Sequence, residues 1–209
     1  TSNTKTRSVV HRLKHLMYDK RELEYSLIID QRKCYDHITP KLVRNALKRL
    51  GFKSDVIDFA INVSFVRESS KWIFPIGTPT SPILHHLVML DFDRWCIGNF
   101  NFYLRYADDC IIACRTKEDA NSAKWRVRNY WWYNLHIRSK RTTTRIQPLS
   151  VPLSFCGFVF NRNAHRKITD HDKGFTRVRR NILHYARNCK KDASWSAYFG
   201  ILFKADSFR

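Results

Sequence analysis

The feature that most constrains this chain is a pair of adjacent aspartates at the tip of a predicted β-hairpin. The tetrad Tyr106-Ala107-Asp108-Asp109 separates two apolar runs, 100–106 and 110–114, that are rich in aromatic and β-branched residues. Such runs predict two antiparallel strands. Adjacent carboxylates repel each other and form poor turns beside buried flanks, so this placement favours a bound cation, with magnesium the expected ion. An ordinary Asp-containing turn is the alternative.

A second candidate ligand follows another apolar run. The run 25–29 ends abruptly at Asp30, as a buried strand does when its last residue emerges at the edge of a site. Further on, Thr39 and Pro40 predict the start of a helix, because Thr is favoured as an N-cap and Pro at the first helical position. Gly51 suits the end of this helix. Asp30 is therefore expected to lie between a buried strand and a helical segment.

Apolar periodicity predicts three more helices, over 54–65, from 82 to about 95 and over 116–133, with Ser81 as the N-cap of the second. The third ends in a cluster of aromatic residues interleaved with basic ones. Such aromatics stack on nucleic-acid bases in some proteins and more often belong to the core.

Two shorter elements complete the pattern. Residues 135–137 are predicted to form a short strand, and 155–160 with a turn at 161–163 are predicted to form a second hairpin.

The charge of the chain is strongly positive and unevenly distributed. The net charge is +20, and residues 121–209 carry nineteen Lys and Arg against four Asp. This excess predicts a polyanionic partner, with nucleic acid the leading one and no membrane partner, since neither a lipid anchor nor a transmembrane run is found. A phosphate-tracking face is expected near the C-terminal end, with a solvated surface as an equal alternative; its residues are Arg177, Arg179, Arg180, Arg187, Lys190 and Lys191.

The cysteines indicate a reducing environment. The sequence contains six, without a Cys-x-x-Cys pair or a His spacing that suits zinc. They are interpreted as reduced core thiols. The chain also opens without the features of a signal peptide, and the expectation is a cytoplasmic protein.

Taken in order, these motifs resemble the palm of a reverse transcriptase. Residues 30–36 look like motif A, 75–82 like motif B, 106–109 like motif C, 135–140 like motif D, and 155–160 like motif E. The resemblance covers about residues 25–160. It implies an α+β fold with a small antiparallel sheet, flanking helices at 40–65 and 82–96 on one face, and a helical thumb.

The same resemblance implies a domain organisation. Residues 1–24 would be a remnant of the fingers or a connecting helix, 25–172 the palm with motifs A to E, and 173–209 the helical thumb. The fingers would be largely missing.

The resemblance also implies an activity and a set of site residues. An RNA-directed DNA polymerase copies template RNA by adding dNTPs to a primer or to the growing cDNA, with two Mg²⁺ ions. The metal site would consist of Asp30, Asp108, Asp109 and the carbonyl of Gln31, and Lys140 would protonate the departing pyrophosphate. The implied nucleotide-binding residues are Tyr35, as the aromatic that excludes a ribose 2′-hydroxyl, with Ile76, Gly77 and Tyr106.

Among reverse transcriptases, the chain looks most like those of diversity-generating retroelements. Pro75-Ile76-Gly77 has an aliphatic residue where retroviral, retron and group II intron enzymes usually have Gln, and residues 196–202 resemble the thumb signature of the diversity-generating group. Residues 79–82 are instead similar to the retron form. The diversity-generating resemblance implies error-prone synthesis and a small basic accessory protein. The alternatives are a retron-type or phage-defence polymerase, and a catalytically silent RNA-binding palm.

Overall fold

The computed structural model describes residues 6–68, 71–75, 78–156 and 158–162, which fall into two compact units. The first unit comprises Thr1–Val9 and Arg21–Pro148, and the second comprises Val10–Lys20 with the chain from Leu149. In the described part, no helix combines the length and apolar character needed to cross a bilayer. The proposed thumb at 173–209 lies outside the described residues, and the boundaries of fingers remnant, palm and thumb remain a proposal.

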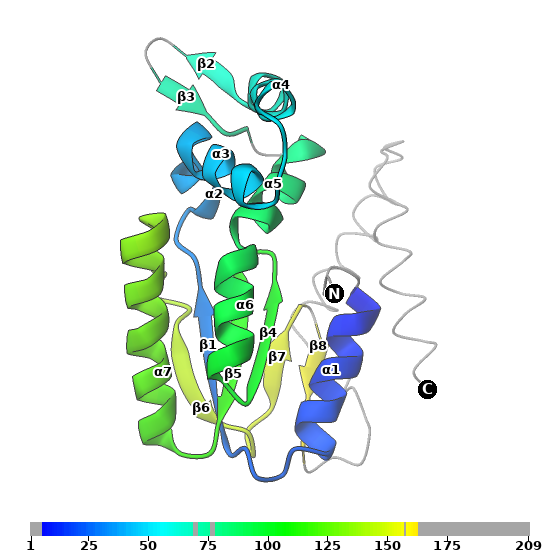
Figure 1. The fold of residues 1–209 in the computed structure, drawn as a ribbon. Helices are drawn as coiled ribbons and strands as arrows, with labels where there is room; N and C mark the ends of the chain where they lie inside the picture. Colours follow the sequence, from blue (N-terminus) through cyan, green and yellow to red (C-terminus); the bar gives the residue numbers. More distant parts are fainter. Residues whose placement is uncertain (1–5, 69–70, 76–77, 157, 163–209) are drawn as a thin grey trace, which may run out of the picture. The chain divides into compact units, whose positions relative to one another are not determined.

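The first unit is built on a four-stranded antiparallel sheet (Figure 1). In spatial order the strands are β4 (Phe102–Tyr106), β5 (Asp109–Cys114), β1 (Tyr25–Asp30) and β6 (Arg145–Pro148). The predicted hairpin and the predicted strand ending at Asp30 are both confirmed. Strand β1 is paired on both edges and buried from Ser26 to Asp30, which explains its continuous apolar run.

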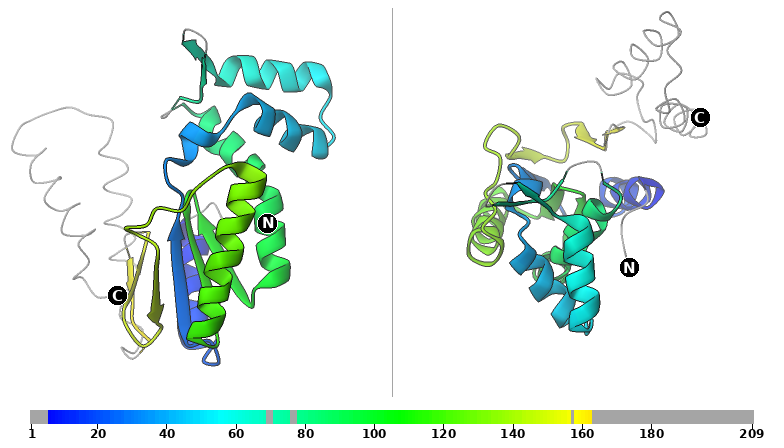
Figure 2. Two further views of the ribbon diagram at one scale, coloured as in Figure 1. Left: turned by 90° about the vertical axis from the view of Figure 1, so that its left-hand side faces the viewer. Right: turned by 90° about the horizontal axis from the view of Figure 1, so that it is seen from above.

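Two helices cover one face of this sheet, α6 (Leu90–Asn99) and α7 (Lys117–Tyr130) (Figure 2). The ring of Phe92 in α6 lies 5.8 Å from that of Tyr103 in β4 and 5.4 Å from that of Trp131, which follows α7. Helix α7 begins with a capping box, in which the Thr116 hydroxyl accepts a hydrogen bond from the backbone N–H of Asp119 at 3.0 Å. These contacts join the two helices and the sheet in one apolar core.

Four further helices of the first unit lie beyond the end of β1 at which Asp30 is located (Figure 1). They are α2 (Cys34–His37), α3 (Pro40–Arg49), α4 (Ser54–Ser64) and α5 (Thr80–Val88), with a small hairpin of β2 (Val66–Glu68) and β3 (Lys71–Ile73). The predicted N-cap is confirmed, because the Thr39 hydroxyl accepts from the Leu42 N–H at 3.3 Å. The glycine after α3 is also confirmed as a helix end, since Gly51 has φ +83°.

Some predicted details of the first unit are wrong. Helix α3 packs mainly against α4 and α5, so the segment 40–65 does not cover the sheet face as expected. The helix predicted from 82 to 95 is divided at Met89 into α5 and α6. Ser81 is not an N-cap, because α5 begins one residue earlier and the Ser81 hydroxyl donates to the Pro75 carbonyl at 2.6 Å.

The strand predicted at 135–137 is also wrong. The chain continues from α7 into a π-helical turn, η1 (Trp131–Leu135), which ends at His136 in the left-handed conformation with φ +55°. Trp131 and Leu135 are buried on the core side, and that packing keeps the segment helical although the sequence alternates as a strand would. The edge of the sheet beside β1 is formed by β6 instead.

The second unit contains the part of α1 (Thr6–Tyr18) from Val10 onward and the hairpin of β7 (Leu153–Phe155) and β8 (Phe158–Phe160). The hairpin was predicted, but its turn lies between Phe155 and Phe158 and not at 161–163. Arg162 caps the C-terminal end of α1. Its guanidinium donates to the carbonyl oxygens of Leu16, Met17 and Lys20 at 3.3, 3.1 and 3.1 Å.

The cysteines agree with the prediction of reduced core thiols as far as the described residues extend. Cys34, Cys96, Cys110 and Cys114 are free and buried, and Cys156 is half-buried. Cys189 lies outside the described residues.

Candidate active site

The candidate site forms where β1 ends beside the turn that connects β4 to β5. The strand register places Asp30 directly opposite Asp109. The N–H of Gln31 donates to the carbonyl oxygen of Asp108 at 3.3 Å, which holds the turn against the end of β1. Because this pairing is antiparallel and in register, carboxylates from two distant parts of the sequence meet at one edge of the sheet.

The turn itself is strained. It has two residues between the paired Tyr106 and Asp109, and the first of them, Ala107, has φ +52°. Glycine is the usual residue at such a position, since a side chain in the left-handed region costs about 1–2 kcal/mol. Strain of this kind is found where the backbone must hold functional groups in a set position, and here it holds Asp108.

The carboxylates of the turn are poorly accommodated as anions. The pKa of Asp109 is raised to about 6, first by burial and then by the negative charges of Asp108 and Asp30. Burial, reinforced by the charge of Asp30, also raises the pKa of Asp108. The site thus gathers like charges in a partly desolvated place, which favours either a proton or a cation.

Asp30 is the most buried member of the group, at 7% exposure. Its Oδ2 accepts a hydrogen bond from the Thr143 hydroxyl at 3.1 Å and lies 3.7 Å from Nζ of Lys140. Its Oδ1 is buried and has no hydrogen-bond partner among the described residues. One carboxylate oxygen is therefore held in place while the other has no donor, which is costly unless a cation is bound there.

Lys140 joins the site as expected, although no strand leads to it. Its backbone N–H donates to the backbone carbonyl of Asp30 at 2.8 Å, and the backbone N–H of Arg32 donates to the backbone carbonyl of Arg138 at 2.8 Å. These two bonds flank a single bridge between Gln31 and Ser139. The Lys140 side chain is half exposed, so it can reach both Asp30 and solvent.

Gln31 differs from the other expected ligands in the direction of its side chain. Gln31 is 2% exposed, and its side-chain amide accepts from His85 Nε2 at 3.2 Å and donates to the Met89 sulfur at 3.4 Å. Burial, followed by the charge of Arg105, lowers the pKa of His85 to about 4, so the imidazole is neutral and donates to the amide. Only the main-chain carbonyl of Gln31 is thus available as a ligand, which is the atom that was expected to serve.

The expected nucleotide-binding residues are only partly described. The ring of Tyr35, on α2, lies 5.9 Å from that of Phe74 and 5.5 Å from that of His85. Tyr106 is half-buried at the last position of β4. Ile76 and Gly77 lie outside the described residues, as do the six basic residues expected at 177–191.

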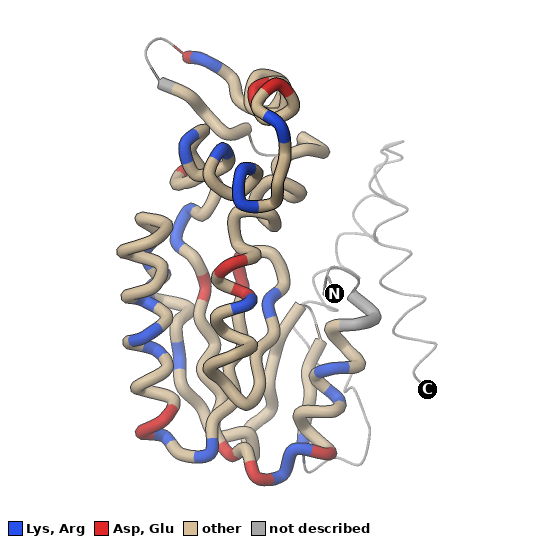
Figure 3. Tube along the Cα trace, in the orientation of Figure 1, with Lys and Arg blue, Asp and Glu red and all other residues tan. Residues whose placement is uncertain are grey.

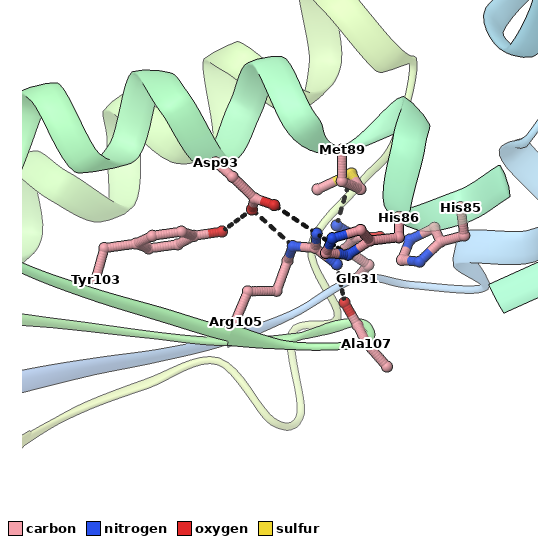
Figure 4. Close-up of polar contacts among 8 residues, drawn as sticks. All are labelled: Gln31, His85, His86, Met89, Asp93, Tyr103, Arg105 and Ala107. Carbon is pink, nitrogen blue, oxygen red and sulfur yellow. Dashed lines mark hydrogen bonds and ion pairs between the residues drawn. The ribbon is translucent and has the colours of Figure 1, made fainter. Parts of the chain in front are cut away.

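A buried polar cluster behind the turn was missed from the sequence (Figure 4). The Arg105 guanidinium makes a bidentate pair with Asp93, with Nε donating to Oδ1 at 2.7 Å and Nη2 to Oδ2 at 2.6 Å. Tyr103 donates to Asp93 Oδ1 at 2.6 Å, and His86 Nδ1 lies 3.1 Å from Arg105 Nη2. Arg105 Nη1 also donates to the Ala107 carbonyl at 2.9 Å, so the cluster supports the turn.

The sequence did contain a signal for this cluster. Arg105 interrupts an apolar strand, and Asp93 interrupts the broad apolar face of a predicted helix. A charge inside a buried pattern is almost always paired, so each residue indicated a partner without showing which one.

In the described ranges, no three His, Cys, Asp or Glu side chains are grouped closely enough to hold a metal ion by themselves. Such an ion would need further oxygen ligands. Magnesium commonly takes them from water and substrate phosphates, with only one or two carboxylates from the protein. Asp30, Asp108 and Asp109, which we call the carboxylate edge, have the oxygen donors for that kind of site.

Comparison of the sequence with known proteins identifies reverse transcriptases in both a family model and a curated relative. A family model described as reverse transcriptase (RNA-dependent DNA polymerase) matches residues 2–160. The retron Ec83 reverse transcriptase of Escherichia coli is 25% identical over 181 residues, covering 80% of this chain and 52% of that protein. The chain thus spans about half the length of this curated relative.

Solved telomerase structures resemble the fold. Apo telomerase from Candida tropicalis matches with a TM-score of 0.60 at 14% identity, over 85% of this chain and 38% of that one. Telomerase from Candida albicans, in complex with the TWJ fragment of telomeric RNA, matches with a TM-score of 0.54 at 11% identity, over 88% of this chain and 39% of that one. At these identities the likeness concerns the fold alone, and it agrees with the predicted α+β palm.

Proposed function

The chain belongs to the reverse transcriptase (RNA-dependent DNA polymerase) family, and from this premise we propose that it copies template RNA into cDNA by nucleotidyl transfer. The observation that carries the proposal is the meeting of Asp30 with the Asp108-Asp109 turn at one edge of the sheet. The substrates would be dNTPs and a primer 3′-end. Lys and Arg are abundant enough along the chain to retain a polyanionic template.

The carboxylate edge fits divalent cations. Asp30, Asp108 and Asp109 would hold two Mg²⁺ ions, with the Gln31 carbonyl as a further ligand. The fit rests on the buried Asp30 Oδ1 without a donor and on the raised pKa values of the other two aspartates. Bound Mg²⁺ would supply Lewis-acid stabilisation of the charge that develops on phosphoryl oxygens.

The chain's own residues would have separate tasks. Asp30, fixed through Oδ2 by Thr143, presents its other oxygen to the site. Lys140, half exposed beside it, would give a proton to departing pyrophosphate. Tyr35, whose ring stacks on Phe74, would form the wall under the sugar that excludes a ribose 2′-hydroxyl.

The subgroup is a finer proposal with two candidates. The diversity-generating type is supported by the aliphatic Ile76 between Pro75 and Gly77, and it predicts low fidelity and a small basic accessory protein. The retron type is supported by the Escherichia coli relative and by residues 79–82. Sequencing the cDNA product separates them, because the first predicts errors concentrated opposite template adenines and the second does not.

The test of the proposed function is primer extension on an RNA template in the presence of Mg²⁺. Asp30→Asn and Asp108→Asn should each abolish extension, while RNA binding measured in parallel stays within about twofold, since affinity comes mainly from basic residues. Asp36→Asn is the matched control, because Asp36 is an exposed carboxylate close in sequence whose one ion pair among the described residues is with Lys33, at 3.7 Å.

Two outcomes would contradict the proposal. Extension by the Asp108→Asn protein at ordinary Mg²⁺ would refute the assigned site. RNA binding by the unaltered chain without any extension would favour the alternative of a catalytically silent RNA-binding palm.

A further inference from the structure

A basic pocket lies along α7 and the segment that follows it. Its volume is about 670 Å³, and its eleven lining residues include five cations and no carboxylate. Figure 3 shows Lys and Arg recurring along α7, with acidic residues only in its first turn. We call this the α7 pocket; its cations are Arg32, Arg128, Arg138, Lys140 and Arg141.

Two tryptophans line the α7 pocket without serving the core. The buried stripe of α7 consists of Ala120, Ala123 and Val127, and it continues into Trp131. Trp125 lies two residues from both Ala123 and Val127, and is therefore about 160° from each around the helix. It is 67% exposed, and Trp132 is 43% exposed. Core packing accounts for neither indole.

The second tryptophan is held in a set orientation. The Arg138 guanidinium lies over the Trp132 ring at 4.7 Å, and the His136 ring meets it edge-on at 6.5 Å. An aromatic surface that is already ordered loses little entropy when a ligand stacks on it. Trp132 is thus preorganised, with Arg138 covering one face of its ring.

The cations around the indoles are available to a ligand. Within the described part of the chain, Arg32, Arg128 and Arg141 take part in no ion pair. Arg128 lies between the two tryptophans in the sequence, on the same length of helix. Uncompensated guanidinium groups around a pocket attract phosphate, and Arg also stacks on flat rings.

We propose that the α7 pocket binds a single strand of nucleic acid, with bases stacking on Trp125 and Trp132 and phosphates contacting Arg128 and Arg141. Interleaved aromatic and basic side chains are the usual means of holding such a strand without regard to sequence. The tryptophans are seven residues apart, about 10 Å along the helix. That distance corresponds to about three steps of a stacked strand at 3.4 Å each.

The arrangement fits a strand better than the other nucleic-acid ligands. A free nucleotide has one base and would use only one of the two indoles. A duplex has its bases paired and would leave both without a stacking partner. Lys140 lines the α7 pocket and also lies beside Asp30, but it is not among the four residues proposed to contact the strand.

The test compares two fluorescent twelve-residue strands by anisotropy at physiological salt, oligo(dT) and an abasic strand with the same backbone. Trp125→Ala/Trp132→Ala should weaken oligo(dT) binding about tenfold or more and leave abasic binding nearly unchanged, since only bases stack. Arg128→Glu should weaken both strands. Trp72→Ala and Lys124→Glu are matched controls, because Trp72 is 46% exposed and neither residue lines the α7 pocket.

Thermal melting followed by circular dichroism confirms that each variant is folded, and Trp125→Ala alone serves if the double variant is not. Asp108→Asn should bind both strands as the unaltered chain does, which separates this test from that of the proposed function. Equal losses on the two strands, no loss on oligo(dT), or an equal loss from Trp72→Ala would each overturn the proposal.

Discussion

The carboxylate edge and the buried cluster around Arg105 use the same chemical groups with opposite electrostatic results. At the edge, Asp109 and Asp108 have raised pKa values because burial and like charges disfavour their ionised forms. In the cluster, the Asp93 carboxylate receives two hydrogen bonds from Arg105 and one from Tyr103. At the carboxylate edge the ionised aspartates are thus disfavoured, whereas in the cluster the ionised Asp93 is stabilised by three hydrogen bonds.

The two regions meet at Ala107. Its backbone is held at φ +52°, and its carbonyl accepts from Arg105 Nη1 at 2.9 Å. The saturated cluster therefore supports the strained turn that presents Asp108. The stability of the turn therefore depends on the cluster behind it, because burial and like charges at the carboxylate edge disfavour the ionised aspartates.

The largest expected effect is the loss of the cluster. Arg105→Met should lower the free energy of unfolding by about 3–5 kcal/mol, because it leaves the carboxylate of a buried pair without its partner. The Arg105 and Asp93 side chains are 4% and 18% exposed. Urea denaturation measures the change.

The matched control is Arg94→Met. Arg94 is 68% exposed and lies 3.5 Å from Asp91, so its pair is expected to contribute about 0–1 kcal/mol. Similar losses from Arg105→Met and Arg94→Met would show that the cluster is no more important than a surface pair, and the contrast between the two regions would disappear.

At the carboxylate edge, by contrast, a substitution is expected to raise the free energy of unfolding, by an amount that depends on pH. The pKa of Asp109 is raised above its unfolded value, so this group destabilises the folded state increasingly as pH rises from about 4 and fully above about 7. Asp109→Asn should therefore raise the free energy of unfolding by about 1–2 kcal/mol relative to the unaltered chain at pH 7.5, allowing for solvent screening. The gain should vanish near pH 4.

Urea denaturation of both proteins from pH 4 to 8, without divalent cations, measures this difference. The Asp36→Asn protein is measured alongside as the control for removing an exposed carboxylate. A loss of stability in Asp109→Asn at pH 7.5, relative to the unaltered chain, would mean that Asp109 is stabilised as an anion in the folded state.

Addition of Mg²⁺ should reduce the electrostatic contrast between the carboxylate edge and the cluster around Arg105, because a cation would compensate the charges of the aspartates. At ten times its dissociation constant a ligand that binds only the folded state stabilises it by about 1.4 kcal/mol. Melting temperature should rise with Mg²⁺ and return on chelation for the unaltered chain, and it should respond much less in Asp30→Asn. An equal response of the two proteins would place the stabilising cation elsewhere.

The smallest effect concerns the strained turn. Ala107→Gly should stabilise the protein by about 0.5 kcal/mol, because relief of the left-handed strain outweighs the extra entropy of glycine in the unfolded chain. Ala60→Gly, within α4, is the control with the opposite sign, at a cost of about 1 kcal/mol. A destabilising Ala107→Gly would show that the turn is not strained.

The carboxylate edge could be predicted from the sequence because its signals are local. An apolar run that ends at Asp30 and a hairpin tip at Asp108 each have a pattern within about ten residues. The step from these patterns to one site came from the resemblance to reverse transcriptases, and the register of β1 with β5 then brought the two ends of the pattern together.

The cluster and the α7 pocket could not be predicted in the same way. Arg105 and Asp93 were visible as charges in apolar patterns, but their pairing depends on how α6 lies on β4. Trp125 and Trp131 look alike in the sequence, and one is exposed while the other is fully buried. The difference arises from the face of α7 that meets the sheet, which side-chain type does not reveal.

The sequence by itself thus determined three strands of the sheet, β1, β4 and β5, with the caps of α3 and the carboxylates, because hydrophobic periodicity and turn chemistry act between near neighbours. The tertiary structure alone decided where helices break and which charges pair. Met89 divides one predicted helix, and the packing of Trp131 and Leu135 turns a predicted strand into a π-helical turn. Those outcomes depend on contacts between residues far apart in the chain, and their free energy exceeds the local preferences that the sequence expresses.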